Sequence, residues 1–131
     1  MSQQRSLAKY QESQILTASR EHLLLLTYDG LLRFLSRAAR GIEDHNYEEK
    51  HIGLSRAQAL VIELYRTLDH GAAPVIGANL ARIYTYLVEE MAQADAHDDA
   101  ARVHAVIAIV ADLRNTWAEA AQHAAGQASA R

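Results

Sequence analysis

Histidine is the residue type with the most chemical potential in this chain, because the sequence has seven histidines and no cysteine. A di-iron helical bundle needs a Glu-x-x-His pair on each of two helices and a glutamate on each of the others. This chain has one such spacing, from Glu48 to His51. The remaining histidines lie near predicted helix ends or at the edge of an apolar seam: His22, His45, His70, His97, His104 and His123. We therefore expect these histidines to be solvated and predict no metal site.

A second possible chemistry is phosphotransfer through His51. The segment His51-Ile-Gly-Leu-Ser is similar to the active histidines of phosphotransfer proteins, which also lie on four-helix bundles, but it lacks the usual lysine-glycine pair. The chain has no ordered serine, histidine and acid set and no glycine-rich phosphate loop. We predict no enzyme and no cofactor, and a phosphotransfer or metal-binding bundle remains the alternative function.

The composition excludes several other classes. A length of 131 residues suits one domain, and a net charge of −3 argues against a nucleic-acid binder, which would show a basic stripe. The chain has no run of about 18 apolar residues, so no membrane insertion is expected. The first residues, MSQQRSLAKYQES, lack the apolar centre of a signal peptide. These features predict a cytoplasmic protein.

Apolar residues at steps of three and four predict a long first helix over Thr17–Arg40, which ends near residues 43–45. Its seam is Leu24, Tyr28, Leu31, Leu35, Ala38 and Ile42. The dipeptide Asp29-Gly30 usually indicates a hairpin turn, but helical periodicity continues on both sides of it. A glycine there indicates the close approach of another backbone, either from a helix of the same domain or from a bound peptide.

Capping residues predict three further helices. Asn46 with Glu49 resembles a capping box that starts the second helix, and Gly71 is expected to end it. Pro74 suits the first position of the third helix, and the acidic pair at 98–99 opens the fourth. The predicted seam of the third helix is Ile76, Leu80, Ile83, Leu87 and Ala94, with Met91 close by.

Four long helices with short links predict an all-α fold, an antiparallel up-down-up-down four-helix bundle over residues 17–125. Residues 1–16 form a short N-terminal arm, and residues 126–131 are expected to be a frayed tail. The arm is either a plain tail or a segment that docks through Tyr10, whose ring is apolar and whose hydroxyl needs a partner.

The chain has more apolar residues than four seams need. This excess is explained either by a broad core or by a groove that binds the apolar face of a partner helix. The candidate partner-binding residues are Tyr10, Leu23, Leu26, Phe34, Leu60, Ile62, Tyr65, Tyr84, Val88 and Met91.

Several motifs in the chain resemble those of the bacterial flagellar export chaperone family FliS. The first is TASREHLLLLTYDGLLRFLSRA, which begins at Thr17, and the others are AQALVIELYRTLD from Ala57, the Leu80, Tyr84 and Tyr86 pattern, and LRNTW from Leu113. Their order and spacing cover roughly residues 10–119. The family's usual proline after Thr-Ala-Ser is Arg20 here, and an expected asparagine is Asp95.

The resemblance implies a cytoplasmic chaperone without catalytic activity. Such a protein would bind the C-terminal segment of flagellin, prevent its premature polymerisation and hand it to the flagellar export gate. A client that is disordered when free and apolar on one face when helical folds on its chaperone at an ordering cost that permits release. In family terms, the arm around Tyr10 covers apolar surface in the free chaperone and moves when flagellin binds.

Overall fold

The structure is a computed structural model that describes the backbone of residues 2–69 and 71–129. Side chains are described for residues 5–7, 21–69, 71–123 and 126. The described chain contains the helices α1 (Ser2–Glu43), α2 (Tyr47–Arg66), α3 (Pro74–His97) and α4 (Ala100–Ser129). Because the described residues include no strand, the predicted all-α class is confirmed.

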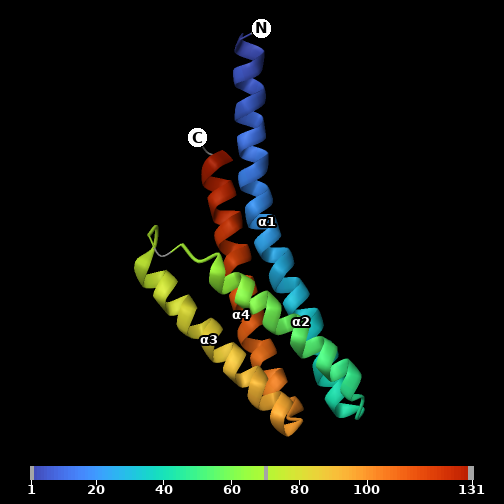
Figure 1. Cartoon of the computed structure of the whole chain (residues 1–131). Helices are drawn as coiled ribbons and strands as arrows, with labels where there is room; N and C mark the ends of the chain where they lie inside the picture. The colour runs from blue at the N-terminus through green and yellow to red at the C-terminus, as the bar shows by residue number, and fades with distance from the viewer. Residues whose placement is uncertain (1, 70, 130–131) are drawn as a thin grey trace.

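The helices form an antiparallel bundle in which each one reverses the direction of the one before it (Figure 1). α1 packs against α2 and α4, and α3 packs against the same two helices from the other side. Short turns after α1 and α3 leave the chain no room to return before the next helix starts, so consecutive helices are antiparallel neighbours. The N-terminal part of α1 extends past the rest of the bundle.

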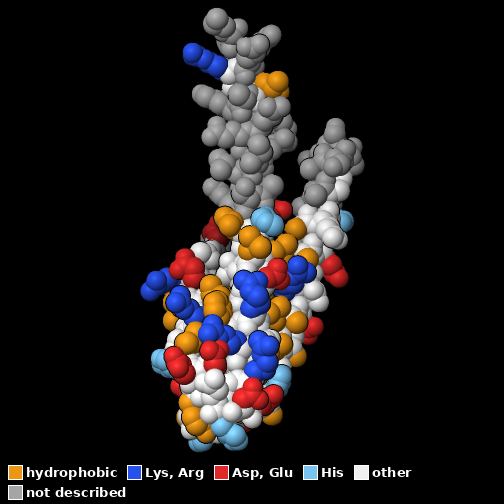
Figure 2. All heavy atoms as spheres, turned by 90° about the vertical axis from the view of Figure 1, so that its right-hand side faces the viewer, with side chains coloured by type: hydrophobic (Ala, Val, Ile, Leu, Met, Phe, Trp, Pro, Cys, Tyr) orange, Lys and Arg blue, Asp and Glu red, His pale blue; other side chains and the backbone are white. Residues whose placement is uncertain are grey.

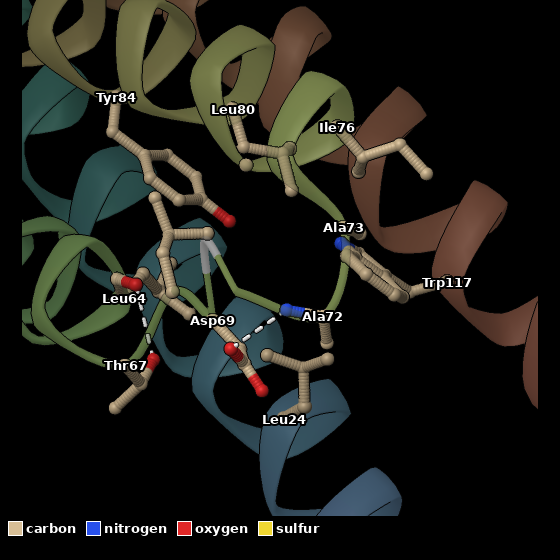
Figure 3. A pocket seen from close by; sticks show the side chains of 12 residues that line it. Leu24, Leu64, Thr67, Asp69, Ala72, Ala73, Ile76, Leu80, Tyr84 and Trp117 are labelled. Carbon is tan, nitrogen blue, oxygen red and sulfur yellow. Dashed lines mark hydrogen bonds between the residues drawn. The ribbon is translucent and has the colours of Figure 1, made fainter.

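The core follows the predicted seam of α1 more closely than that of α3. Buried residues of α3 follow one another at alternating steps of four and three: Leu80, Tyr84, Leu87, Met91 and Ala94. Ile76 was predicted in the seam, but its side chain is 58% exposed. It lies in the first turn of α3, where it lines a cavity instead of the core (Figure 3).

Two predicted helix starts are confirmed. The side-chain oxygen of Asn46 accepts a hydrogen bond from the backbone N–H of Glu49 at 3.3 Å, as an N-cap does. Pro74 is the first residue of α3, where its missing N–H costs nothing because that donor would have no partner within the helix.

Other helix ends differ from the prediction. α1 begins at Ser2 instead of Thr17, and α4 continues past Gly126 to Ser129. α2 ends at Arg66, before Gly71. Asp98 closes α3 in a left-handed conformation with φ of 50°, so of the acidic pair only Asp99 caps α4, through its contact with the Arg102 N–H at 3.1 Å.

Backbone atoms of a neighbouring segment come close at Gly41 and Gly53 but not at Gly30. A Cβ atom added to Gly53 would lie 2.6 Å from the Phe34 carbonyl oxygen, and one added to Gly41 would lie 2.5 Å from the Lys50 nitrogen. At Gly30 the nearest atoms, both in side chains, would be 3.6 Å away, which is an ordinary contact. The expected approach of a helix backbone from the same domain at Gly30 is therefore wrong, and α1 and α2 instead meet at the other two glycines. The alternative of a bound peptide at Gly30 stays a prediction.

Candidate functional site

Four of the predicted partner-binding residues expose large apolar surfaces: Leu23, Leu26, Ile62 and Tyr65. Two lie on α1 and two on α2, the pair of helices that pack most extensively together. Figure 2 shows hydrophobic side chains gathered in the upper part of the described surface, whereas charged side chains dominate its middle. Exposed apolar side chains that gather in this way are typical of an interaction surface.

A hollow of about 230 Å³ lies between α2 and α3 and is called the α2/α3 groove below. Its lining residues are Val61, Ile62, Tyr65, Tyr84, Thr85, Val88 and Glu89. Positions 61 and 65 of α2, and 84 and 88 of α3, are one helical turn apart, so each helix supplies one wall. Most of the lining is apolar, and the exposed carboxylate of Glu89 stands among it. Such a groove suits the apolar face of a peptide helix.

Two further hollows border α1. One, of about 570 Å³, lies between α1 and α2 and is lined by Leu23, Leu24, Thr27, Glu63, Leu64 and Thr67. The other, of about 470 Å³, lies along α1 and is lined by Leu32, Arg33, Phe34, Ser36, Arg37 and Arg40. Leu23 therefore belongs to a hollow that adjoins α2, whereas Phe34 is half-buried in a basic environment. Leu60 is partly buried and packs against the core.

The end cavity, of about 230 Å³, opens where the link between α2 and α3 passes over the bundle (Figure 3). Tyr84 reaches into it from α3, Leu24 from α1 and Trp117 from α4. The link is held by the Asp69 carboxylate, which accepts from the backbone N–H groups of Gly71 and Ala72 at 3.1 Å each. Because Tyr84 also lines the α2/α3 groove, its ring separates two hollows.

A buried polar cluster joins three helices beside the end cavity. The hydroxyl groups of Tyr28 and Tyr84 share a hydrogen bond of 2.5 Å, and Trp117 Nε1 donates to the Tyr28 oxygen at 3.0 Å. Burial raises the pKa of both tyrosines, so both hydroxyls remain protonated at neutral pH. One turn of chain away, Arg114 Nε donates to the Asp29 carboxylate at 3.0 Å and ties α4 to α1 again.

Two of the predicted partner-binding residues lie in the core. Tyr84 is 2% exposed and Met91 is fully buried, because the helical spacing places both on the inward face of α3. Met91 therefore offers no surface to a partner in this conformation, and Tyr84 offers only the edge that lines the hollows. Val88 is partly buried and stays on the groove wall. The Tyr10 side chain lies outside the described residues.

The sequence reasoning missed Val75, Ile76 and Tyr86, which are also exposed. Ile76 was missed because the seam was extended one turn too far, and the exposure of Val75 carries no signal in the sequence. The described residues also show no assembled site for the metal-binding alternative or for phosphotransfer through histidine. His51 is exposed, and among the described residues no three His, Asp or Glu side chains gather closely enough to hold a metal ion.

Residues 2–124 match the family described as flagellar protein FliS. The flagellar secretion chaperone FliS of Bacillus subtilis (strain 168) is 31% identical over 122 residues, which are 93% of this chain and 90% of that protein. The one of Escherichia coli (strain K12) is 30% identical over 109 residues, 82% of this chain and 80% of that protein. This chain belongs to the FliS family.

The FliS family is a family of flagellar secretion chaperones and is non-enzymatic. This confirms the predicted family and the prediction of a chaperone without catalytic activity. Three of the four motifs that carried the resemblance meet in the fold. Tyr28 and Asp29 come from the first motif, Tyr84 from the third, and Arg114 and Trp117 from the last, and they contact one another as described above. These three motifs thus build the polar contacts between α1, α3 and α4.

Asp95, which stands where the family pattern has asparagine, pairs with Lys50 at 3.0 Å. Lys50 also contacts Asp98 at 2.6 Å, so it links the start of α2 to the end of α3. Within the described residues, none of the helices combines the length and the apolar character that crossing a membrane requires.

Proposed function

We propose that this FliS protein is a cytoplasmic chaperone that binds the C-terminal segment of flagellin and keeps flagellin from polymerising before export. It then passes flagellin to the flagellar export gate. The observation that carries the proposal is the apolar α2/α3 groove, rimmed by the exposed Ile62 and Tyr65, on a chain of the secretion-chaperone family. The Bacillus subtilis and Escherichia coli relatives bear the name flagellar secretion chaperone.

The groove suits this client for a physical reason. A flagellin segment that becomes helical on binding buries its apolar face against Ile62, Tyr65 and Val88, and this burial offsets the cost of ordering the segment. The net binding free energy that remains after the ordering cost is small, so the complex persists until export and can still release its client. The apolar hollow between α1 and α2, which includes Leu23, extends the available surface around α2.

Titration calorimetry with flagellin, and with flagellin that lacks its C-terminal segment, tests the proposal. We expect one-to-one binding with a negative heat-capacity change for the full protein, and no binding for the truncated one. Equal binding of both forms would exclude the C-terminal segment as the client site.

A matched pair of variants locates the groove. Tyr65 and Tyr86 are 47% and 49% exposed, but only Tyr65 lines the α2/α3 groove. We expect Tyr65→Asp to weaken flagellin binding about tenfold or more, because a charge replaces an apolar contact, and Tyr86→Asp to leave it near wild type. Helix content measured by circular dichroism should be unchanged in both. Equal losses of affinity would place the client elsewhere.

We also propose that residues 1–16 act as a lid that covers apolar surface in the free chaperone. The segment precedes the exposed Leu23 and Leu26, and burial of a ring such as that of Tyr10 contributes on the order of 2 kcal/mol. To fold back, α1 has to bend near residues 17–20. Deleting residues 1–16 should slightly lower the stability of the free protein and change its affinity for flagellin. If neither quantity changes, the segment is a plain tail.

A further inference from the structure

The polar cluster of Tyr28, Tyr84 and Trp117 lies in an otherwise apolar core. Tyr28 and Tyr84 are buried to 2% exposure or less, and the partners available to their hydroxyls are each other and the indole of Trp117. Because an indole N–H can only donate, the Tyr28 oxygen accepts from Trp117. Tyr28 is therefore the central member, and both other side chains depend on its hydroxyl.

The position of Tyr84 matters for the groove because its ring forms part of the groove lining. The same ring faces the end cavity on its other side, so a turn of the side chain would fill one hollow and enlarge the other. The hydrogen bond to Tyr28 holds the Tyr84 hydroxyl toward the core. The ring then forms part of the groove wall and does not enter the groove. Ile62 and Val88 line the same groove from α2 and α3.

We propose that Tyr28 is a positioning residue for client binding, which holds the Tyr84 ring out of the α2/α3 groove without touching the client itself. This inference rests on the proposed function. It assigns to the first FliS motif a role in shaping the groove, although Tyr28 lies on α1, a helix that contributes no residue to the groove lining.

Removal of the Tyr28 hydroxyl has a predictable consequence. A buried hydroxyl without a partner is costly, so Tyr84 must find water or another acceptor. The nearest opening is the groove that its ring already lines, and a turned Tyr84 then occupies space that the client needs. If Tyr84 loses its hydroxyl as well, nothing draws the ring into the groove and the groove regains its shape.

The test compares Tyr28→Phe with the double variant Tyr28→Phe/Tyr84→Phe, using a peptide of the flagellin C-terminal segment in titration calorimetry. We expect the dissociation constant of Tyr28→Phe to rise roughly two- to tenfold, the size of one lost hydrogen bond. The double variant should recover most of that affinity. Val103→Ala is the control, since Val103 is buried on α4 outside every groove described here and its loss lowers stability without changing the groove.

Fluorescence supplies an independent readout. Trp117 is the only tryptophan in the sequence, so its emission reports on the cluster directly. Emission of the free Tyr28→Phe protein should shift from that of the wild type, while that of Val103→Ala should not. A shift without any change in affinity would show that the cluster was broken and that it does not position the groove.

Each outcome decides the matter. Weaker binding by Tyr28→Phe, recovery in the double variant and unchanged binding by Val103→Ala support the positioning role. Wild-type affinity in Tyr28→Phe, or a double variant no better than the single one, overturns that role and leaves the proposed function standing. If the wild-type protein fails to bind the peptide, the proposed function falls and the positioning role falls with it.

Discussion

Substitution of Gly53 by alanine tests how closely α1 and α2 approach each other. The added methyl group would lie 2.6 Å from the Phe34 carbonyl oxygen and 2.7 Å from the Ala38 nitrogen. Both are backbone atoms of α1, so no side chain can turn aside to make room, and the two helices must separate. Gly30→Ala is the matched comparison, because its methyl group would meet only side-chain atoms at 3.6 Å.

The magnitudes follow from two opposing terms. Alanine favours a helix interior by about 1 kcal/mol over glycine, and overpacking costs typically 1–3 kcal/mol, with the upper end expected where backbone is struck. We therefore expect Gly53→Ala to lower the free energy of unfolding by about 2 kcal/mol and Gly30→Ala to raise it by about 1 kcal/mol. The two glycines respond in opposite directions although both are buried in mid-helix.

Urea unfolding followed by circular dichroism measures the difference. With a slope of about 1–3 kcal/mol per molar urea, the midpoints of the two variants should differ by roughly 1 M or more. The slopes should match that of the wild type. A Gly53→Ala midpoint at or above the wild-type value would refute the close backbone contact. A loss of stability in Gly30→Ala would refute the open surroundings assigned to that glycine.

Two further predictions concern the core. Because burial raises the pKa of Tyr28 and Tyr84 above 10, the folded chain keeps protons that the unfolded chain releases. Stability should hold below pH 10 and then fall by up to about 1.4 kcal/mol per pH unit for each tyrosine, more weakly in Tyr28→Phe, as urea midpoints between pH 8 and 11 would measure. Met91→Ala should cost about 2–5 kcal/mol of unfolding free energy and Leu23→Ala less than about 0.5 kcal/mol, and thermal unfolding that shows equal losses would contradict their assigned burial.

Local patterns in the sequence were enough to predict the class of fold and the starts of α2 and α3. Periodicity at steps of three and four depends on neighbouring residues alone, and so does the Asn46 cap, which the structure confirms. The resemblance to FliS likewise rested on motifs that the sequence displays in order, and the family match confirms it. The start of α1 at Ser2 was missed because polar residues can extend a helix without an apolar pattern.

The sequence alone could not separate residues of the same type. Tyr65, Tyr84 and Tyr86 lie on predicted helices, yet Tyr84 is 2% exposed and the other two are about half exposed. Tyr84 lies on the inward face of α3, and its buried hydroxyl is satisfied by that of Tyr28, 56 residues earlier in the chain. The sequence therefore predicted the groove lining only in part. Ile62 and Tyr65 line the groove, whereas Met91, a candidate of the same kind, does not.

The glycines show the same division between local and tertiary information. The sequence marked Gly30 because the Asp-Gly pair is unusual in a helix, and it left Gly53 unmarked because nothing beside that residue is unusual. Which glycine admits a neighbouring backbone depends on where two helices cross. The sequence by itself determined that there would be four amphipathic helices of the FliS kind. Only the tertiary structure decided which of their faces meet, because that choice depends on contacts between residues far apart in the chain.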